Sequence, residues 1–183
     1  MLRSASARVP DSSRANPPPS TRSFEVQALH NYVDADACPV KHETYRVADR
    51  HGVRVTLVAG SWMRIPSQPN LTFEVVRRGF DAVDDWIAAH AGSGDIVITA
   101  DIPLASRCIE RGACVIAPTG RPFTESNIGD ALATRNLLSE MRGAGMVAGG
   151  PSPFHARGRS RYLQTLDRAI HAIRRGPAGS DPS

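Results

Sequence analysis

The chain twice repeats a short pattern in which an apolar run ends in aspartate and a proline soon follows. Residues 32–39 read YVDADACP, and residues 95–103 read DIVITADIP. Proline is tolerated at the first helical position because its missing N–H would have no partner there. An apolar run of strand length followed by such a helix start indicates a buried strand that leads into a helix. The repeat therefore favours an α/β architecture.

Apolar and β-branched runs alternate with segments of helical periodicity along most of the chain. Strands are expected at 28–33, 53–59, 71–76, 95–100 and 113–117. Helices are expected at 39–51, 79–89, 102–109, 124–141 and 157–174, with Gly52 ending the first. This alternation predicts a three-layer α/β fold with a central, mostly parallel sheet of about five strands flanked by helices.

The composition suits one domain with a sizeable core. Among 183 residues, 41% are hydrophobic and 22% are charged, and we place the domain at residues 26–175. Residues 1–25 are rich in Ser, Arg and Pro and are expected to form a disordered tail, as are residues 176–183. No run approaches the roughly 18 apolar residues of a membrane span, so no membrane association is expected. The three cysteines form no CxxC pair, which favours a cytoplasmic protein without disulfides or a structural zinc site.

The net charge of +4 is unevenly distributed. Residues 151–183 carry six arginines against two aspartates, whereas residues 26–150 are acidic overall. An acidic middle beside a basic segment suits a cation site next to a surface that attracts phosphate. A solvated basic helix without a partner would have the same charges.

Aspartates gather where the predicted strands end and helices begin. Asp34, Asp36 and Asp101 follow the two repeated strands, and ligands of open α/β sheets bind outside the carboxyl ends of strands. Asp34, Asp36 or Asp101 could instead simply cap the helix that follows. Asp81, Asp84 and Asp85 lie near one face of a first helical turn. Like charges at that spacing repel, and a bound cation would compensate them.

Two other features leave alternatives open. Trp62, in the loop at residues 60–70, is expected to pin its loop to the core, and the alternative is a stacking or phosphate-contacting surface with Met63 and Arg64. Cys38, beside the acids, is expected to be a packed thiol rather than a nucleophile, because no base is recognisable near it in sequence.

Several motifs in order resemble the YaiI/YqxD family of bacterial proteins of unknown function. They are VDADACPV, GFDAVDD, GDIVITADIPLA, a Pro-Thr-Gly segment followed by Thr and Asn-Ile, and GGPSPF, and the match spans residues 32–166. The resemblance implies a PIN-like fold, since the family is grouped with PIN and NYN nuclease-like domains, which typically hold divalent metals with carboxylates and cleave RNA. It further implies that Asp34, Asp81 or Asp85, and Asp101 correspond to that acidic cluster.

The leading hypothesis is a nuclease that depends on Mg²⁺ or Mn²⁺, with RNA as its expected substrate. Oxygen ligands without a His or Cys constellation select these ions rather than zinc. The expected metal ligands are Asp34 and Asp101, with Asp81, Asp85 and Asp36 as further ligands or a water-orienting base. The expected substrate-binding residues are Arg64, Asn127, Arg135 and Arg157, which would hold the phosphate backbone.

Two alternatives remain at this point. A non-catalytic RNA-binding or regulatory module with a PIN-like fold would also use the C-terminal arginines. A phosphatase resembling the haloacid dehalogenases would use Asp34 as nucleophile and Asp36 as general acid, because Asp-x-Asp follows a strand in those enzymes.

Overall fold

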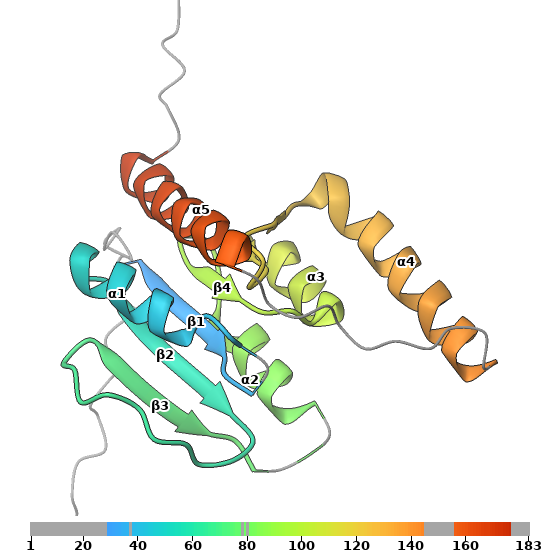
Figure 1. The fold of residues 1–183 in the computed structure, drawn as a ribbon, viewed down its shortest axis with the longest axis horizontal. Coiled ribbons are helices and arrows are strands. Elements are labelled where there is room, and N and C mark those ends of the chain that lie inside the picture. The colour runs from blue at the N-terminus through green and yellow to red at the C-terminus, as the bar shows by residue number, and fades with distance from the viewer. Residues whose placement is uncertain (1–28, 37, 78, 80, 145–155, 177–183) are drawn as a thin grey trace, which may run out of the picture.

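The structure, a computed structural model, describes residues 29–36, 38–77, 79, 81–144 and 156–176. Its centre is a six-stranded sheet in the order β3-β2-β1-β4-β5-β6 (Figure 1). The strands are β1 (His30–Asp34), β2 (Arg54–Ala59), β3 (Leu71–Val75), β4 (Ile96–Ile98), β5 (Cys114–Ile116) and β6 (Pro122–Phe123). All pairings are parallel except β5 with β6. The predicted mostly parallel sheet is confirmed.

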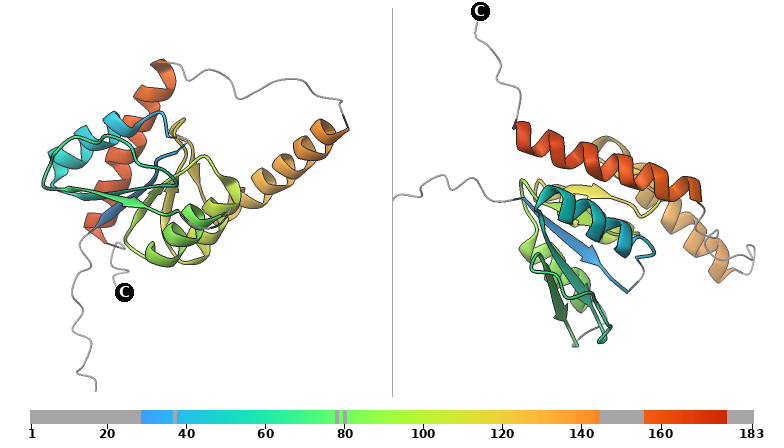
Figure 2. Two further views of the ribbon diagram at one scale, coloured as in Figure 1. Left: turned by 90° about the horizontal axis from the view of Figure 1, so that it is seen from below. Right: turned by 60° about the vertical axis from the view of Figure 1, so that its left-hand side comes forward.

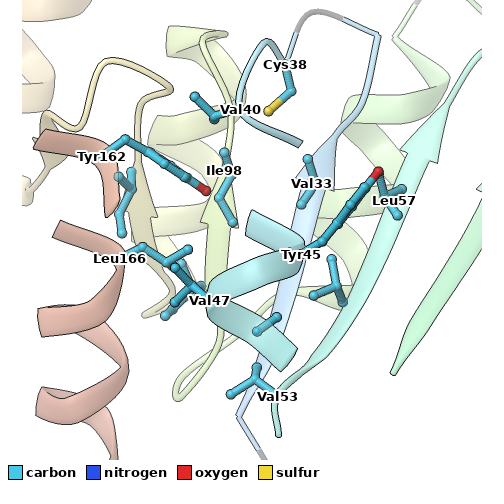
Figure 3. Packing of buried hydrophobic residues seen from close by; sticks show 14 of the residues in the cluster. Val33, Cys38, Val40, Tyr45, Val47, Val53, Leu57, Ile98, Tyr162 and Leu166 are labelled. Carbon is cyan, nitrogen blue, oxygen red and sulfur yellow. The ribbon is translucent and has the colours of Figure 1, made fainter. Parts of the chain in front are cut away.

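Helices cover both faces of the sheet and complete the three layers. They are α1 (Lys41–His51), α2 (Ala82–His90), α3 (Ile102–Glu110), α4 (Glu125–Gly143) and α5 (Ala156–Arg175). Side chains of α1 and α5 share one buried cluster with the sheet (Figure 3). Side chains of α2, α3 and the start of α4 share the other. The predicted three-layer α/β class is therefore confirmed. The added strand β6 is only two residues long, too short to give a periodic signal.

The central strands explain the position of the acidic residues. β1 lies between β2 and β4, and Asp34 at its end is in register with Val58. Val33 is in register with Ile98, so Thr99 and Asp101 follow β4 at the same edge of the sheet. The two copies of the strand–acid–proline pattern therefore lie side by side, because they belong to adjacent parallel strands.

The N-termini of α1 and α3 are capped differently, although both helices follow the repeated sequence pattern. Asp101 caps α3, because its side chain accepts a hydrogen bond from the Leu104 amide, and Pro103 lies in the first turn. Val40 occupies the N-cap position of α1 and makes no side-chain cap there, so neither Asp34 nor Asp36 caps that helix. Gly52 ends α1 in a left-handed conformation, as predicted.

The last described helix, α5, is docked on the sheet by buried side chains and by close backbone contact. Tyr162, Leu166 and Ile170 are fully buried, and the Tyr162 hydroxyl is 2.6 Å from the Thr44 hydroxyl of α1. Burial raises the pKa of Tyr162, so this phenol stays neutral. The Thr165 hydroxyl donates to the Gly120 carbonyl at 2.9 Å.

The long helix α4 contrasts with α5, because it runs away from the sheet after its first turns (Figures 1 and 2). Only Ile128 and Ala131 are buried in it, and Leu137 and Leu138 are exposed. Among the described helices, none is long and apolar enough to cross a membrane. The predicted tail at 1–25, most of the tail at 176–183 and the GGPSPF segment lie outside the described residues.

The close approach of α5 predicts a different cost of alanine at two glycines with positive φ. A Cβ on Gly120 would lie 2.5 Å from the Tyr162 backbone nitrogen, whereas a Cβ on Gly52 would meet nothing within 4 Å. Gly52→Ala is expected to lose about 1–2 kcal/mol through left-handed strain alone. Gly120→Ala is expected to lose about 1–3 kcal/mol more through overpacking. Equal losses in urea unfolding would contradict this packing of α5.

Candidate functional site

Four aspartates line one cavity at the carboxyl edge of the sheet. The cavity measures about 210 Å³ and lies between the ends of β1 and β2 and the start of α2. Among its described lining residues, Asp34, Asp36, Asp81 and Asp84 are acidic and none is basic. The fold therefore brings carboxylates of the opening strand together with those that begin α2.

Asp34 is the most buried of these carboxylates. It ends β1, and the buried Thr99 hydroxyl donates to its Oδ2 at 3.0 Å. Burial raises the pKa of Asp34, and the negative charges of Asp36 and Asp101 raise it further, against the lowering effect of the Thr99 hydrogen bond. The carboxylate is thus fixed in position but lacks full charge compensation.

Asp36 is positioned by the backbone of the neighbouring strand. The Gly60 amide, directly after β2, donates to Asp36 Oδ2 at 2.8 Å. The Lys41 ammonium donates to the Ala35 carbonyl at 2.8 Å, which ties the chain between Asp34 and Asp36 to the first turn of α1. Both contacts tie the two residues directly after Asp34 to neighbouring elements.

Asp101 combines the capping role with proximity to the cluster. Its Oδ1 accepts the Leu104 amide hydrogen bond at 2.8 Å, and its own amide donates to Thr99 Oγ1 at 3.0 Å. Its negative charge contributes to the raised pKa of both Asp34 and Asp84. Capping and a place beside the cluster are therefore compatible.

Asp84 and Asp85, adjacent on α2, face different surroundings. Burial raises the pKa of Asp84 to about 6, and the negative charges of Asp101, Asp34 and Asp81 add to that rise. Asp85 instead forms an ion pair with Arg107 at 2.8 Å, and its side chain is 67% exposed. Asp81 occupies the N-cap position of α2 without making a side-chain cap. Asp84 therefore faces the cluster, and Asp85 is paired outside it.

The sequence places Asp84 with Asp81 and Asp85 on one face of the predicted helix, but Asp84 is not among the expected ligands, and Thr99 has no expected role. A usable signal existed for Asp84, because Ile87 and Ala88, three and four residues later, are the buried residues of α2. Residues at those spacings share a helix face, so Asp84 turns toward the sheet. For Thr99 the signal was its place between a buried strand and Asp101.

The predicted substrate-binding residues are dispersed. Arg64 is exposed in the loop after β2, and Arg157 is exposed on α5. Asn127 completes the capping box of α4 with Thr124, so its side chain serves the helix start. Arg135 lines a second cavity of about 370 Å³ together with Arg121 and Arg142.

That second cavity lies next to Asp101. Ala100 and Ile102, the residues on either side of Asp101 in the chain, line it together with residues of α4. Arg121 lies 5.7 Å above the centre of the Phe123 ring. A basic, partly apolar hollow therefore flanks the acidic edge of the sheet.

The position of Trp62 contradicts the expectation that it pins its loop, and the position of Cys38 confirms the expected packed thiol. Trp62 is 70% exposed, so the expectation that it pins the loop is wrong. Met63 and Ile65 pack against the core instead. Cys38 is buried, and burial raises its pKa to about 11, as suits a packed thiol and not a nucleophile.

The sheet-edge carboxylates offer oxygen ligands, the type that hard divalent cations bind. Mg²⁺ retains several waters and binds through one or two carboxylates, so it does not require closely clustered ligands. Three ligand atoms of the sheet-edge carboxylates do not come within 4.8 Å of one another among the described residues, unlike those of the His51, Asp167 and His171 group. Burial first, and neighbouring negative charges second, raise the pKa values of Asp34 and Asp84, and a cation bound beside them would lower both.

Fold and cavity together define a three-layer α/β protein with an acidic hollow at the carboxyl edge of its parallel strands. The family model described as "Uncharacterized BCR, YaiI/YqxD family" matches residues 32–172. The chain therefore belongs to the YaiI/YqxD family, as its motifs indicated.

Relatives in other bacteria cover most of the chain. A UPF0178 protein of Nitrobacter winogradskyi is 58% identical over 153 residues, which is 84% of this chain and 98% of the relative. A UPF0178 protein of a Bradyrhizobium species is 57% identical over 82% of this chain and 92% of its own length. One from Rhodopseudomonas palustris is 56% identical over 79% and 93%. No solved structure gives a significant match.

The crowding of charge around Asp84 predicts a stabilising substitution. The folded pKa lies near 6, above the ordinary 3.8, so stability is lost as the pH rises through this range. Asp84→Asn is expected to be about 1 kcal/mol more stable than the parent at pH 7.5 without divalent metal, after allowance for solvent screening. The gain should vanish below pH 4. Asp85→Asn, which loses the Arg107 pair, is the control and should gain nothing in thermal unfolding.

Proposed function

We propose that this protein is a nuclease that hydrolyses phosphodiesters of RNA with Mg²⁺ or Mn²⁺. The supporting observation is the convergence of Asp34, Asp36, Asp81 and Asp84 on one cavity beside Asp101. Within the proposal, a PIN-like classification and a cytoplasmic location remain predictions that go with this function.

The metal would be held by Asp34 and Asp84, with Asp101 beside them. Bound there, it would supply charge stabilisation to the attacking water and to the leaving oxygen. Asp36 and Asp81 would be further ligands or would orient the attacking water. Thr99 acts as a positioning residue, because its hydroxyl joins Asp34 to the backbone of Asp101. In this proposal Asp85 has no direct part, since Arg107 holds it.

Two surfaces support a nucleic-acid substrate. Arg121, Arg135 and Arg142 line the cavity next to Asp101, where guanidinium groups would contact phosphates. The exposed indole of Trp62 lies two residues beyond Gly60, whose amide holds Asp36. Aromatic side chains of this kind stack on unpaired bases, which favours single-stranded RNA.

The metal assignment predicts the loss of cleavage on removal of a carboxylate. Asp34→Asn and Asp84→Asn are each expected to lower the rate of Mn²⁺-dependent cleavage of single-stranded RNA by about 100-fold or more. Asp85→Asn is the matched control and should retain cleavage. Full activity in Asp34→Asn would refute this site.

A non-catalytic RNA-binding protein is the second candidate. It is favoured by the wide spacing of the carboxylates and by the exposed Trp62, which serve binding without chemistry. The two candidates differ in one measurement, because a binding protein would retain RNA without cleaving it at any Mg²⁺ or Mn²⁺ concentration.

Both candidates predict weaker RNA binding when the two surfaces are altered. Trp62→Ala is expected to lose about 1–3 kcal/mol of affinity for single-stranded RNA through lost stacking. Arg135→Ala should weaken binding and make it less dependent on salt. Arg54→Ala removes an exposed arginine at the start of β2, at the opposite edge, and should bind as the parent does in fluorescence anisotropy.

A further inference from the structure

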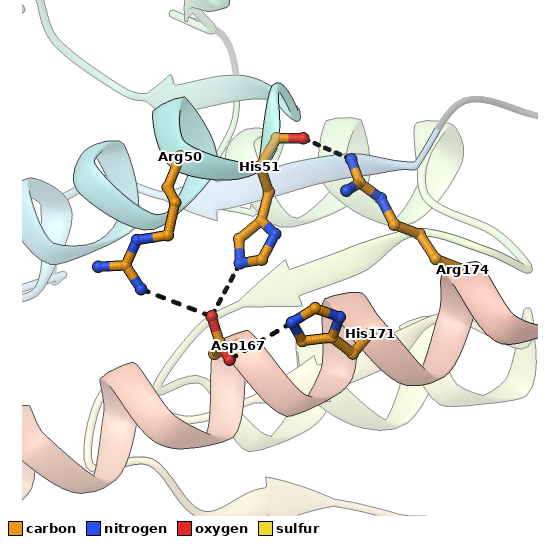
Figure 4. Close-up of polar contacts among 5 residues, drawn as sticks. All are labelled: Arg50, His51, Asp167, His171 and Arg174. Carbon is orange, nitrogen blue, oxygen red and sulfur yellow. Dashed lines mark hydrogen bonds and ion pairs between the residues drawn. The ribbon is translucent and has the colours of Figure 1, made fainter.

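A second group of ligand-bearing side chains lies on the face of the sheet covered by α1 and α5. His51 is the last residue of α1, and Asp167 and His171 lie one turn apart on α5 (Figure 4). One ligand atom from each residue lies within 4.8 Å of the other two. Residues more than a hundred positions apart in the chain thus meet at one point.

The side chains are arranged around the carboxylate of Asp167. His51 Nε2 lies 2.8 Å from Oδ1, and His171 Nε2 lies 3.7 Å from Oδ2. Both imidazoles present Nε2 to the carboxylate, and the two rings are 5.0 Å apart at 88° to each other. The hydrogen bond from His51 holds the pKa of Asp167 below its usual range, which keeps the carboxylate ionised.

The group is buried at His51 and open to solvent at Asp167 and His171. The His51 side chain is 9% exposed, whereas Asp167 and His171 are 35% and 55% exposed. The Arg174 guanidinium donates to the His51 carbonyl, which fixes the end of α1 against α5. A ligand could therefore enter from solvent and meet side chains that are already held in place.

We infer that His51, Asp167 and His171 form a binding site for Zn²⁺ or a similar borderline transition metal. Two imidazole nitrogens and one carboxylate are a ligand set found at zinc sites that keep a fourth position for water. Zinc–ligand distances of about 2.0–2.2 Å place tetrahedral ligands roughly 3.3–3.5 Å apart. His51 Nε2 would move about half an ångström away from Asp167 Oδ1, and any ligand pair as far apart as 4.8 Å would close by about 1.5 Å.

The competing interpretation is a hydrogen-bonded ion pair that only joins two helices. Arg50 lies 3.7 Å from the same Asp167 oxygen, and its side chain is mostly exposed. Because Arg50 can turn into solvent at little cost, it would yield its place to a cation. Binding would replace the hydrogen bond between His51 and Asp167 with two bonds to the metal, and the displaced proton would pass to solvent.

This site would differ from the sheet-edge cavity in the ion it selects. Imidazole nitrogens favour zinc and its neighbours, whereas a set of carboxylates favours Mg²⁺ or Mn²⁺. The metal would bridge α1 and α5, and its binding energy would add to the stability of the docked helix. The inference does not depend on nuclease activity.

Zinc titration of the full chain tests the site. After treatment with a chelator, the protein is expected to bind one Zn²⁺ per chain in calorimetry, and its Tm should rise with Zn²⁺ concentration. Co²⁺ in the same site should give visible absorption bands. His171→Ala removes an exposed ligand. It should weaken Zn²⁺ binding by at least about 10-fold, because the loss of an outer-shell contact alone weakens binding by about 10- to 100-fold. Asp167→Asn should do the same.

Two controls separate this site from others. His42→Ala removes an exposed histidine of the same helix α1 and should leave Zn²⁺ binding unchanged. Asp34→Asn should also leave it unchanged, because the sheet edge is a separate site. The inference is overturned if the parent shows no saturable Zn²⁺ binding, if His171→Ala binds as tightly as the parent, or if Asp34→Asn abolishes binding.

Discussion

The hydrogen bond from buried Thr99 to Asp34 joins the ends of the two central strands. It forms because β1 and β4 are parallel neighbours, so both strands end at one edge. The same threonine accepts the amide of Asp101, from which α3 begins. The Thr99 side chain thus holds the Asp34 carboxylate and the start of α3 in fixed positions relative to each other. Burial makes the negative charge of Asp34 energetically unfavourable, and a bound cation would reduce that penalty.

Sequence patterns were sufficient for the architecture. The repeated apolar run with aspartate and proline predicted the strands β1 and β4 and their helices, because strand and helix starts depend on local chemistry. The Gly52 helix end was predicted on the same ground. The site could be predicted only to the level of its segments. Which of two adjacent aspartates faces the cavity depends on how Ile87 and Ala88 pack on the sheet.

Contacts between distant segments were beyond the sequence. The expectation that zinc ligands are lacking considered only groups that are close in sequence. His51 meets Asp167 and His171 because α5 packs across α1, which no local pattern encodes. Trp62 shows the opposite case, in which a general tendency of tryptophan toward burial is overruled by Met63 and Ile65 holding the loop.

The docking of α5 has a consequence for the order of folding during synthesis. Domains begin to fold while the chain is being made, from the N-terminal side. The sheet and α1 through α4 emerge before Tyr162, Leu166 and Ile170, which complete one of the two buried clusters. Until α5 arrives, the nascent chain exposes the apolar surface of α1 and the central strands.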